Sequence, residues 1–102
     1  MEIIWTEEAQ KELLAVTRYY WDCAGERVAD KMFRTITDTV SRLSIFPFIG
    51  QRVAGYADLY RSIVAHPHYK VIYRVENDKV IVISVWDCRQ DPATLEDELN
   101  AD

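Results

Sequence analysis

The sequence predicts an α+β fold in which a short strand and a helical hairpin precede a three-stranded antiparallel meander, with the sheet packed on the two helices. Apolar residues recur every three or four positions between residues 7 and 45, which indicates amphipathic helices. After Gly50 the spacing changes to alternation, which is typical of strands. Two turn signals, Pro67-His68 and Asn77-Asp78, divide this second region into three runs.

The first helix has a well-marked start and end. Residues 3–5 form a short apolar run typical of a strand, and Thr6 after it has the chemistry of a helix N-cap. Two acids occupy the first turn, where the helix dipole favours negative charge. A single buried face follows at spacings of four, three and four residues: Ala9, Leu13, Val16 and Tyr20. Gly25 is the predicted stop.

A second helix is predicted from Glu26 to about Ile45 or Phe46, where Pro47 ends it. Its apolar stripe consists of Ala29, Met32, Phe33, Ile36, Val40 and Leu43. Because the link at residues 24–25 is so short, the two helices must lie antiparallel.

The predicted strands are residues 59–66, 69–75 and 79–86. Short links make them an antiparallel meander. The third strand is apolar throughout residues 80–83, so we expect it to be covered at least partly on both faces. The helical hairpin would cover one sheet face and leave the other open. The domain is expected to span residues 1–95, followed by an acidic tail at residues 96–102. The segment from Pro92 could form a short helix, which its acids would leave weakly anchored.

Length and composition bound the class of protein. A chain of 102 residues suits one domain, and 49% hydrophobic residues can build one core. No run approaches the roughly 18 apolar residues of a membrane span, and the acidic N-terminus is unlike a signal peptide. Cys23 and Cys88 have neither metal-site nor disulfide spacing. We expect both to be buried apolar fillers, in a cytoplasmic protein.

The net charge of −5 conceals a positive middle third. Residues 41–74 hold one acid, Asp58, against five bases, a net charge of +4. The five bases are Arg42, Arg52, Arg61, Lys70 and Arg74. Such a region can meet a nucleic acid or an acidic protein surface. The alternative is that these bases only occupy solvent-facing strand positions.

Aromatic residues divide into core and surface candidates. Trp5 and Trp86 end apolar strands and are expected in the core. The run Tyr19-Tyr20-Trp21 is wider than one buried stripe needs, so part of it is expected to be exposed as a protein contact. By strand parity Arg61 falls among apolar neighbours. Its charge there requires either an ion pair, with Asp87 or Asp91, or a recessed anion site.

Five segments together resemble the RelE/ParE toxin superfamily, which includes plasmid stabilisation proteins. They are Trp5–Ala9, Phe46–Gly50, Leu59–Ile63, Tyr69–Val75 and Val85–Pro92. The resemblance extends to about Leu95 and implies the toxin of a type II toxin–antitoxin module, neutralised by a cognate antitoxin. Exposed members of the run Tyr19, Tyr20 and Trp21 would suit a contact with the antitoxin or a second copy, in a homodimer or a toxin–antitoxin hetero-oligomer, and core packing of the run is the alternative.

The resemblance implies two alternative targets. RelE-like members cut messenger RNA on the ribosome by a metal-independent attack of the 2′-hydroxyl, which needs acid–base groups and cations for the phosphate. Arg61 and Arg89 match the family's arginines, and His66 and His68 are acid–base candidates by residue type. ParE-like members bind DNA gyrase and need no chemistry, cofactor or metal.

The ParE-like alternative is favoured here because the acid–base set is thin and the chain is acidic. Its candidate target-binding cations are Arg52, Arg61, Lys70, Arg74 and Arg89. A remnant that binds antitoxin without being toxic is the third alternative.

Overall fold

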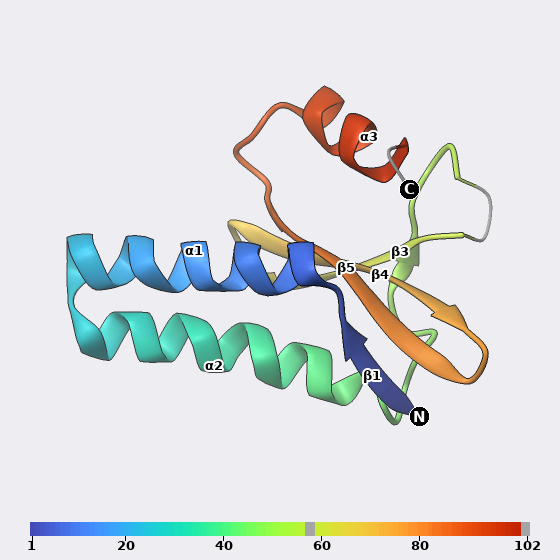
Figure 1. Cartoon of the computed structure of the whole chain (residues 1–102), viewed down its shortest axis with the longest axis horizontal. Coiled ribbons are helices and arrows are strands. Elements are labelled where there is room, and N and C mark those ends of the chain that lie inside the picture. Colours follow the sequence, from blue (N-terminus) through green and yellow to red (C-terminus); the bar gives the residue numbers. More distant parts are fainter. Residues whose placement is uncertain (57–58, 101–102) are drawn as a thin grey trace.

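The computed structural model describes residues 1–56 and 59–100, and its elements follow the predicted order (Figure 1). They are β1 (Glu2–Trp5), α1 (Glu7–Ala24), α2 (Glu26–Arg42), β2 (Gln51–Arg52), β3 (Arg61–His66), β4 (Tyr69–Glu76), β5 (Lys79–Asp87) and α3 (Pro92–Asn100). The strand, the helical hairpin and the meander are therefore confirmed. α3 forms in the segment where a short helix was considered, and β2 is an addition.

The hairpin forms where the local sequence specifies its ends. The hydroxyl of Thr6 accepts a hydrogen bond from the Ala9 N–H at 3.2 Å, as an N-cap does. Gly25 has φ +91°, a conformation open to glycine, and it both ends α1 and precedes α2. α2 ends at Arg42, three residues before the predicted limit. From Leu43 to Ile45 each N–H bonds to the carbonyl three residues back, so the helix tightens before Pro47 interrupts it.

The five strands form one mixed sheet in the order β1-β5-β4-β3-β2. β1 pairs parallel with β5, and the other pairs are antiparallel. Asn77 and Asp78 both have positive φ, 53° and 61°, which gives the tight turn predicted between β4 and β5. The register between these strands shifts between Ile72 and Tyr73, where β5 carries one extra residue, Ile83.

The hairpin covers one face of the sheet, and its distal end projects past the sheet edge (Figure 1). Helix residues Leu13, Met32 and Ile36 pack there against strand residues such as Val71 and Val82. β5 is buried along most of its length, as its apolar run predicted.

The expectation of an open second face is wrong, because α3 packs on it. Leu95 and Leu99 are buried with Ile72, Ile83 and Trp86. Residues 96–100 of the predicted tail therefore belong to α3, and residues 101–102 lie outside the described part. Trp86 is buried and Trp5 packs at the edge of the hairpin core, as predicted.

Both cysteines are exposed, so their prediction as buried fillers is wrong. Cys23 lies in the last turn of α1, away from the sheet, and Cys88 lies in the turn after β5. Neither position faces a core layer. Within the described residues, none of the helices combines the length and apolar character needed to cross a membrane.

Candidate functional site around Tyr69

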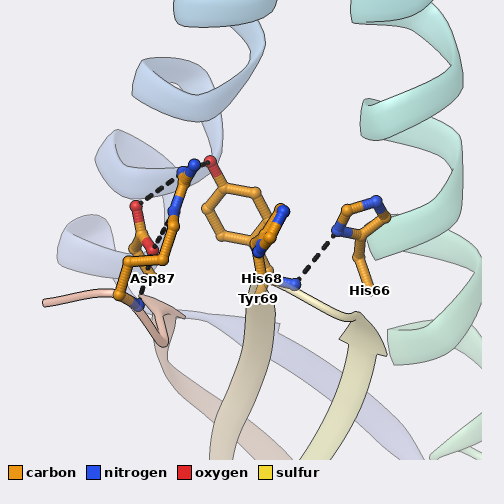
Figure 2. Close-up of polar contacts among 5 residues, drawn as sticks. His66, His68, Tyr69 and Asp87 are labelled. Carbon is orange, nitrogen blue, oxygen red and sulfur yellow. Dashed lines mark hydrogen bonds and ion pairs between the residues drawn. The ribbon is translucent and has the colours of Figure 1, made fainter.

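The end of β4 at Tyr69 gathers predicted site residues from two turns (Figure 2). His66 and His68 flank the turn between β3 and β4, and Arg89 lies in the turn after β5. The backbone N–H of Cys88 donates to the carbonyl of His68 at 2.8 Å, which joins the two turns. Tyr69 is almost completely buried between them.

Arg89 is held in place by a carboxylate and a phenol. Its Nε and Nη2 atoms donate to the two oxygens of Asp87 at 3.0 and 2.9 Å, and Nη2 also donates to the Tyr69 hydroxyl at 3.2 Å. Its Cζ lies 5.8 Å from the centre of the Tyr69 ring. The guanidinium holds the pKa of Asp87 below its usual range, and the hydrogen bonds that Arg89 donates to Asp87 raise the pKa of Arg89. Arg89 is thus a preoriented cation whose charge is largely balanced.

The two histidines form a pair beside this cation. The backbone N–H of His68 donates to Nδ1 of His66 at 3.2 Å, so neutral His66 carries its proton on Nε2. Their ring centres are 5.4 Å apart, and His66 lies 6.1 Å from the Tyr69 ring. Burial lowers the pKa of His66, and the positive charges of His68, Arg89 and Lys31 lower it further.

A pocket of about 340 Å³ opens beside Arg89, between α1 and the end of β5. Tyr19, Tyr69 and Asp87 line it, together with Glu12 from the middle of α1. Glu12 accepts a hydrogen bond from the Val85 N–H at 3.2 Å. This N–H lies beyond the end of β1, whose pairing with β5 stops at Val82, so Glu12 supplies the acceptor. Burial and then the nearby charge of Glu98 raise the pKa of Glu12 to about 7.

Glu8, Glu12 and Glu98 bring carboxylate oxygens within 4.8 Å of one another, a spacing at which a divalent cation could be held. The group joins α1 to α3. Such acidic groups are common without any ion.

Arg61 lies apart from this cluster. It donates to the carbonyls of Gly50 at 2.9 Å and Phe48 at 3.3 Å, and its Cζ lies 5.1 Å from the Phe48 ring centre. Arg61 lies opposite Tyr73 on β4, four residues from Tyr69, or roughly 13 Å along the strand. The structure therefore does not bring Arg61 and Arg89 together, and Asp87 pairs with Arg89.

Of the remaining predicted cations, Lys70 and Arg74 lie on the α3 side of the sheet, and Arg52 lies at its β2 edge. Lys70 and Arg52 line a pocket of about 330 Å³ beneath α3. Ser62 of β3, the strand between β2 and β4, also lines it. Arg74 follows Lys70 on the same face by strand alternation, and its Nε lies 3.1 Å from a carboxylate oxygen of Glu76. The five candidate cations are therefore distributed over three places.

The aromatic run on α1 divides as predicted. Tyr19 and Trp21 are about half exposed, whereas Tyr20 turns inward and meets Tyr69 edge to face at 6.3 Å. The predicted contact surface therefore adjoins the histidine and arginine cluster through Tyr20. Sequence reasoning missed Tyr69, Glu12 and Lys31 as members of this region. A signal existed for Glu12, since it lies three residues after Ala9 and four before Val16 and so falls on the buried face of α1.

Comparisons with known proteins agree with this architecture. The family model described as the ParE toxin of the type II toxin–antitoxin system parDE matches residues 3–92. No curated protein matches the chain.

Three solved structures share the fold at about one-fifth identity. The chromosomal ParDE toxin–antitoxin system of P. aeruginosa has a TM-score of 0.74 at 19% identity, covering 85% of this chain and 95% of that chain. A YoeB/ParE toxin from Agrobacterium tumefaciens has a TM-score of 0.63 at 19% identity, covering 85% and 98%. The isolated E. coli RelE toxin has a TM-score of 0.57 at 20% identity, covering 98% and 97%. The chain therefore belongs to the ParE toxin family of type II toxin–antitoxin systems, within the RelE/ParE superfamily.

Proposed function

We propose that the protein inhibits DNA gyrase by binding it, without chemistry of its own, and that a cognate antitoxin neutralises it. The observation that carries the proposal is the packing of α3 on the sheet face opposite the hairpin, the face with which the resemblance implies that RelE-like members cut messenger RNA. Leu95 and Leu99 are buried there against Ile72, Ile83 and Trp86. α3 therefore keeps an RNA strand from the part of that face formed by Ile72, Ile83 and Trp86.

The engagement of Arg61 supports the same conclusion. A nuclease needs a cation free to bind the phosphate as charge develops on it. The Arg61 guanidinium instead donates to two backbone carbonyls and stacks on Phe48. An inhibitor that only binds has no need of a free phosphate cation at this position.

The surface around Arg89 is the proposed contact with the target. Arg89 is held rigidly by Asp87 and Tyr69, and His68 beside it is exposed. Rigid arginines and aromatic residues are enriched at protein interfaces, because little conformational entropy is lost when they bind. Lys70 and Arg74 on the α3 side, with Arg52 at the β2 edge, are a second candidate region for the target. Arg61 would contribute to target binding indirectly, by holding the loop at Phe48 and Gly50 in place.

The surface proposed for the antitoxin is the distal part of α1. Tyr19 and Trp21 are about half exposed in the free protein, and Tyr20 anchors them to the core. Exposed aromatic side chains of this kind typically become buried in a complex.

A supercoiling assay with purified gyrase tests the proposal. The toxin should reduce supercoiling and accumulate cleaved DNA, and prior addition of the antitoxin should prevent both effects. Arg89→Ala should weaken the inhibition, whereas Arg18→Ala, which removes another aspartate-paired arginine, should not. Unaltered gyrase at toxin concentrations that arrest growth would refute the proposal.

One observation favours a second candidate, a RelE-like messenger RNA nuclease. His66 lies within electrostatic reach of both His68 and Arg89, and the three residues offer both proton transfer and a cation. In a translation reaction that contains ribosomes, a nuclease would produce cut transcripts that disappear with His66→Gln or Arg89→Ala. Normal growth without antitoxin, together with intact antitoxin binding, would instead identify a non-toxic remnant.

A further inference from the structure

The loop between α2 and β2 carries an exposed apolar cluster, residues 45–49. Ile45 is 74% exposed, and Phe46, Phe48 and Ile49 are each 60% exposed. With Pro47 they surround a hollow of about 420 Å³ whose lining is almost entirely apolar. Soluble proteins rarely expose four large apolar side chains side by side unless another molecule covers them.

The loop is fixed in shape. Arg61 donates to the carbonyls at its end, and the Gly50 N–H donates to the Tyr73 hydroxyl at 2.9 Å. Gly50 fits only because it has no side chain, since an added Cβ would lie 2.6 Å from that hydroxyl and 2.8 Å from the Ser62 carbonyl oxygen. A surface held in place before binding loses little entropy when a partner docks.

Charge around the cluster selects the chemistry of the partner. The described residues 41–56 include Arg42 and Arg52 and no acid, and Arg61 lies beneath Phe48. A partner with apolar side chains flanked by carboxylates would complement this surface. A second copy in a two-fold contact would instead place arginines against arginines.

A nucleic acid fits less well than a protein. Bases stack on aromatic rings, but Ile45 and Ile49 offer only aliphatic surface. Arg61 is also committed to backbone carbonyls rather than displayed to phosphates.

We infer that the 45–49 cluster is a docking site for an apolar, acid-flanked segment of the antitoxin, an inference that rests on the proposed function. The antitoxin is the occupant rather than gyrase because the cluster needs continuous covering. An exposed cluster of this size promotes aggregation of the free chain, and a partner made together with the toxin covers it from the start.

The cluster lies at the opposite end of the hairpin from Tyr19 and Trp21 (Figure 1). α1 alone, with 18 residues, is about 27 Å long. An antitoxin that contacts both surfaces would therefore run along the hairpin in an extended or helical form.

The test uses the double variant Ile45→Ser with Phe46→Ser, in the full-length protein. The probe is the purified product of the reading frame adjacent to the toxin gene. Val64→Ser is the matched control, since Val64 is 70% exposed but lies on β3 outside the cluster. The double variant should bind the probe roughly 100-fold more weakly, while the control should bind like the unaltered chain. Arg42→Glu should also weaken binding, and most strongly at low salt.

The same variants are assayed for growth arrest and for gyrase inhibition. The double variant should remain toxic and should escape neutralisation by the antitoxin. Equal binding by the double variant and the unaltered chain would overturn the inference, as would an equal loss in Val64→Ser. Loss of gyrase inhibition with intact probe binding would assign the cluster to the target and would also overturn it.

Three further readouts separate the other outcomes. If sedimentation shows a dimer that the double variant dissociates, the occupant is a second copy and the inference fails. It also fails if a fluorescent 20-nucleotide RNA binds the unaltered chain but not the double variant. If the unaltered chain does not bind the probe at all, the proposed antitoxin partnership itself is refuted.

Discussion

The guanidinium of Arg89 lies against the ring of Tyr69, with Cζ 5.8 Å from the ring centre, and donates to its hydroxyl at 3.2 Å. Asp87 holds the other side of the same guanidinium through two hydrogen bonds. A bidentate carboxylate and an aromatic face fix both the position and the plane of this cation. The arrangement would be lost with lysine, which has neither the fork nor the flat surface.

Replacement of Arg89 by lysine should therefore reduce gyrase inhibition about tenfold, although the charge is conserved. Tyr69→Phe should have a smaller effect, because the contact with Asp87 remains. Inhibition is measured as the toxin concentration that halves supercoiling. Equal inhibition by Arg89→Lys and the unaltered chain would mean that only the charge of Arg89 matters.

The pKa of His66 is lowered by burial and by the neighbouring positive charges, so the folded state favours its neutral form. Its contribution to stability should be fully present above the unfolded pKa of about 6.5 and should decrease as the pH falls below that value. NMR titration of the His66 ring should give a midpoint below that of a histidine peptide. The stability of His66→Gln, measured by denaturation, should decrease less at acid pH than that of the unaltered chain. An NMR titration midpoint above 6.5 for His66 would contradict the prediction.

Glu12 should make the protein less stable as the pH rises. Its pKa is raised to about 7 from 4.5, so the folded state holds the proton more tightly between these values. The free energy of unfolding should fall across this window by about 2 kcal/mol, after discounting for partial solvent exposure. Glu12→Gln can still accept from Val85 and should be more stable than the unaltered chain at pH 8, with little difference at pH 4.

Urea denaturation at both pH values measures this difference. Glu7→Gln, an exposed carboxyl on the same helix, is the control and should retain the pH dependence of the unaltered chain. If the free energy of unfolding changes with pH by the same amount in Glu12→Gln as in the unaltered chain, Glu12 is not the group that titrates.

Gly50→Ala should destabilise the fold by about 1–3 kcal/mol, because the new methyl group would contact the Tyr73 hydroxyl and the Ser62 backbone. Gly55→Ala is the comparison, since Gly55 has φ +91° but no neighbour within 4 Å of an added Cβ. It should cost only the backbone strain, about 1 kcal/mol. Thermal denaturation of both variants measures the difference, and a larger effect at Gly55 would contradict the packing argument.

Periodicity predicted the helices and the meander because the spacing of buried side chains is a local property of each element. The burial of α3 was missed because acids surround its two leucines. Leu95 and Leu99 are four residues apart and therefore share one helix face, which the acidic composition of the segment concealed. Hydrophobic spacing, rather than net charge, was the informative signal there.

The candidate site was predictable only where its contacts are local. Asp87 and Arg89 are two residues apart, so an ion pair between them could be anticipated. The commitment of Arg61 to the carbonyls of Phe48 and Gly50 could not, because it depends on how the loop at residues 46–50 folds back on β3. Strand alternation placed Arg61 among apolar neighbours but could not identify its acceptors.

The parallel pairing of β1 with β5 has a consequence for synthesis of the protein. Ile3 lies opposite Val80, so β1 has no neighbouring strand until β5 has been synthesised. β1 pairs with no other described strand, so the sheet closes only once β5 is available to it.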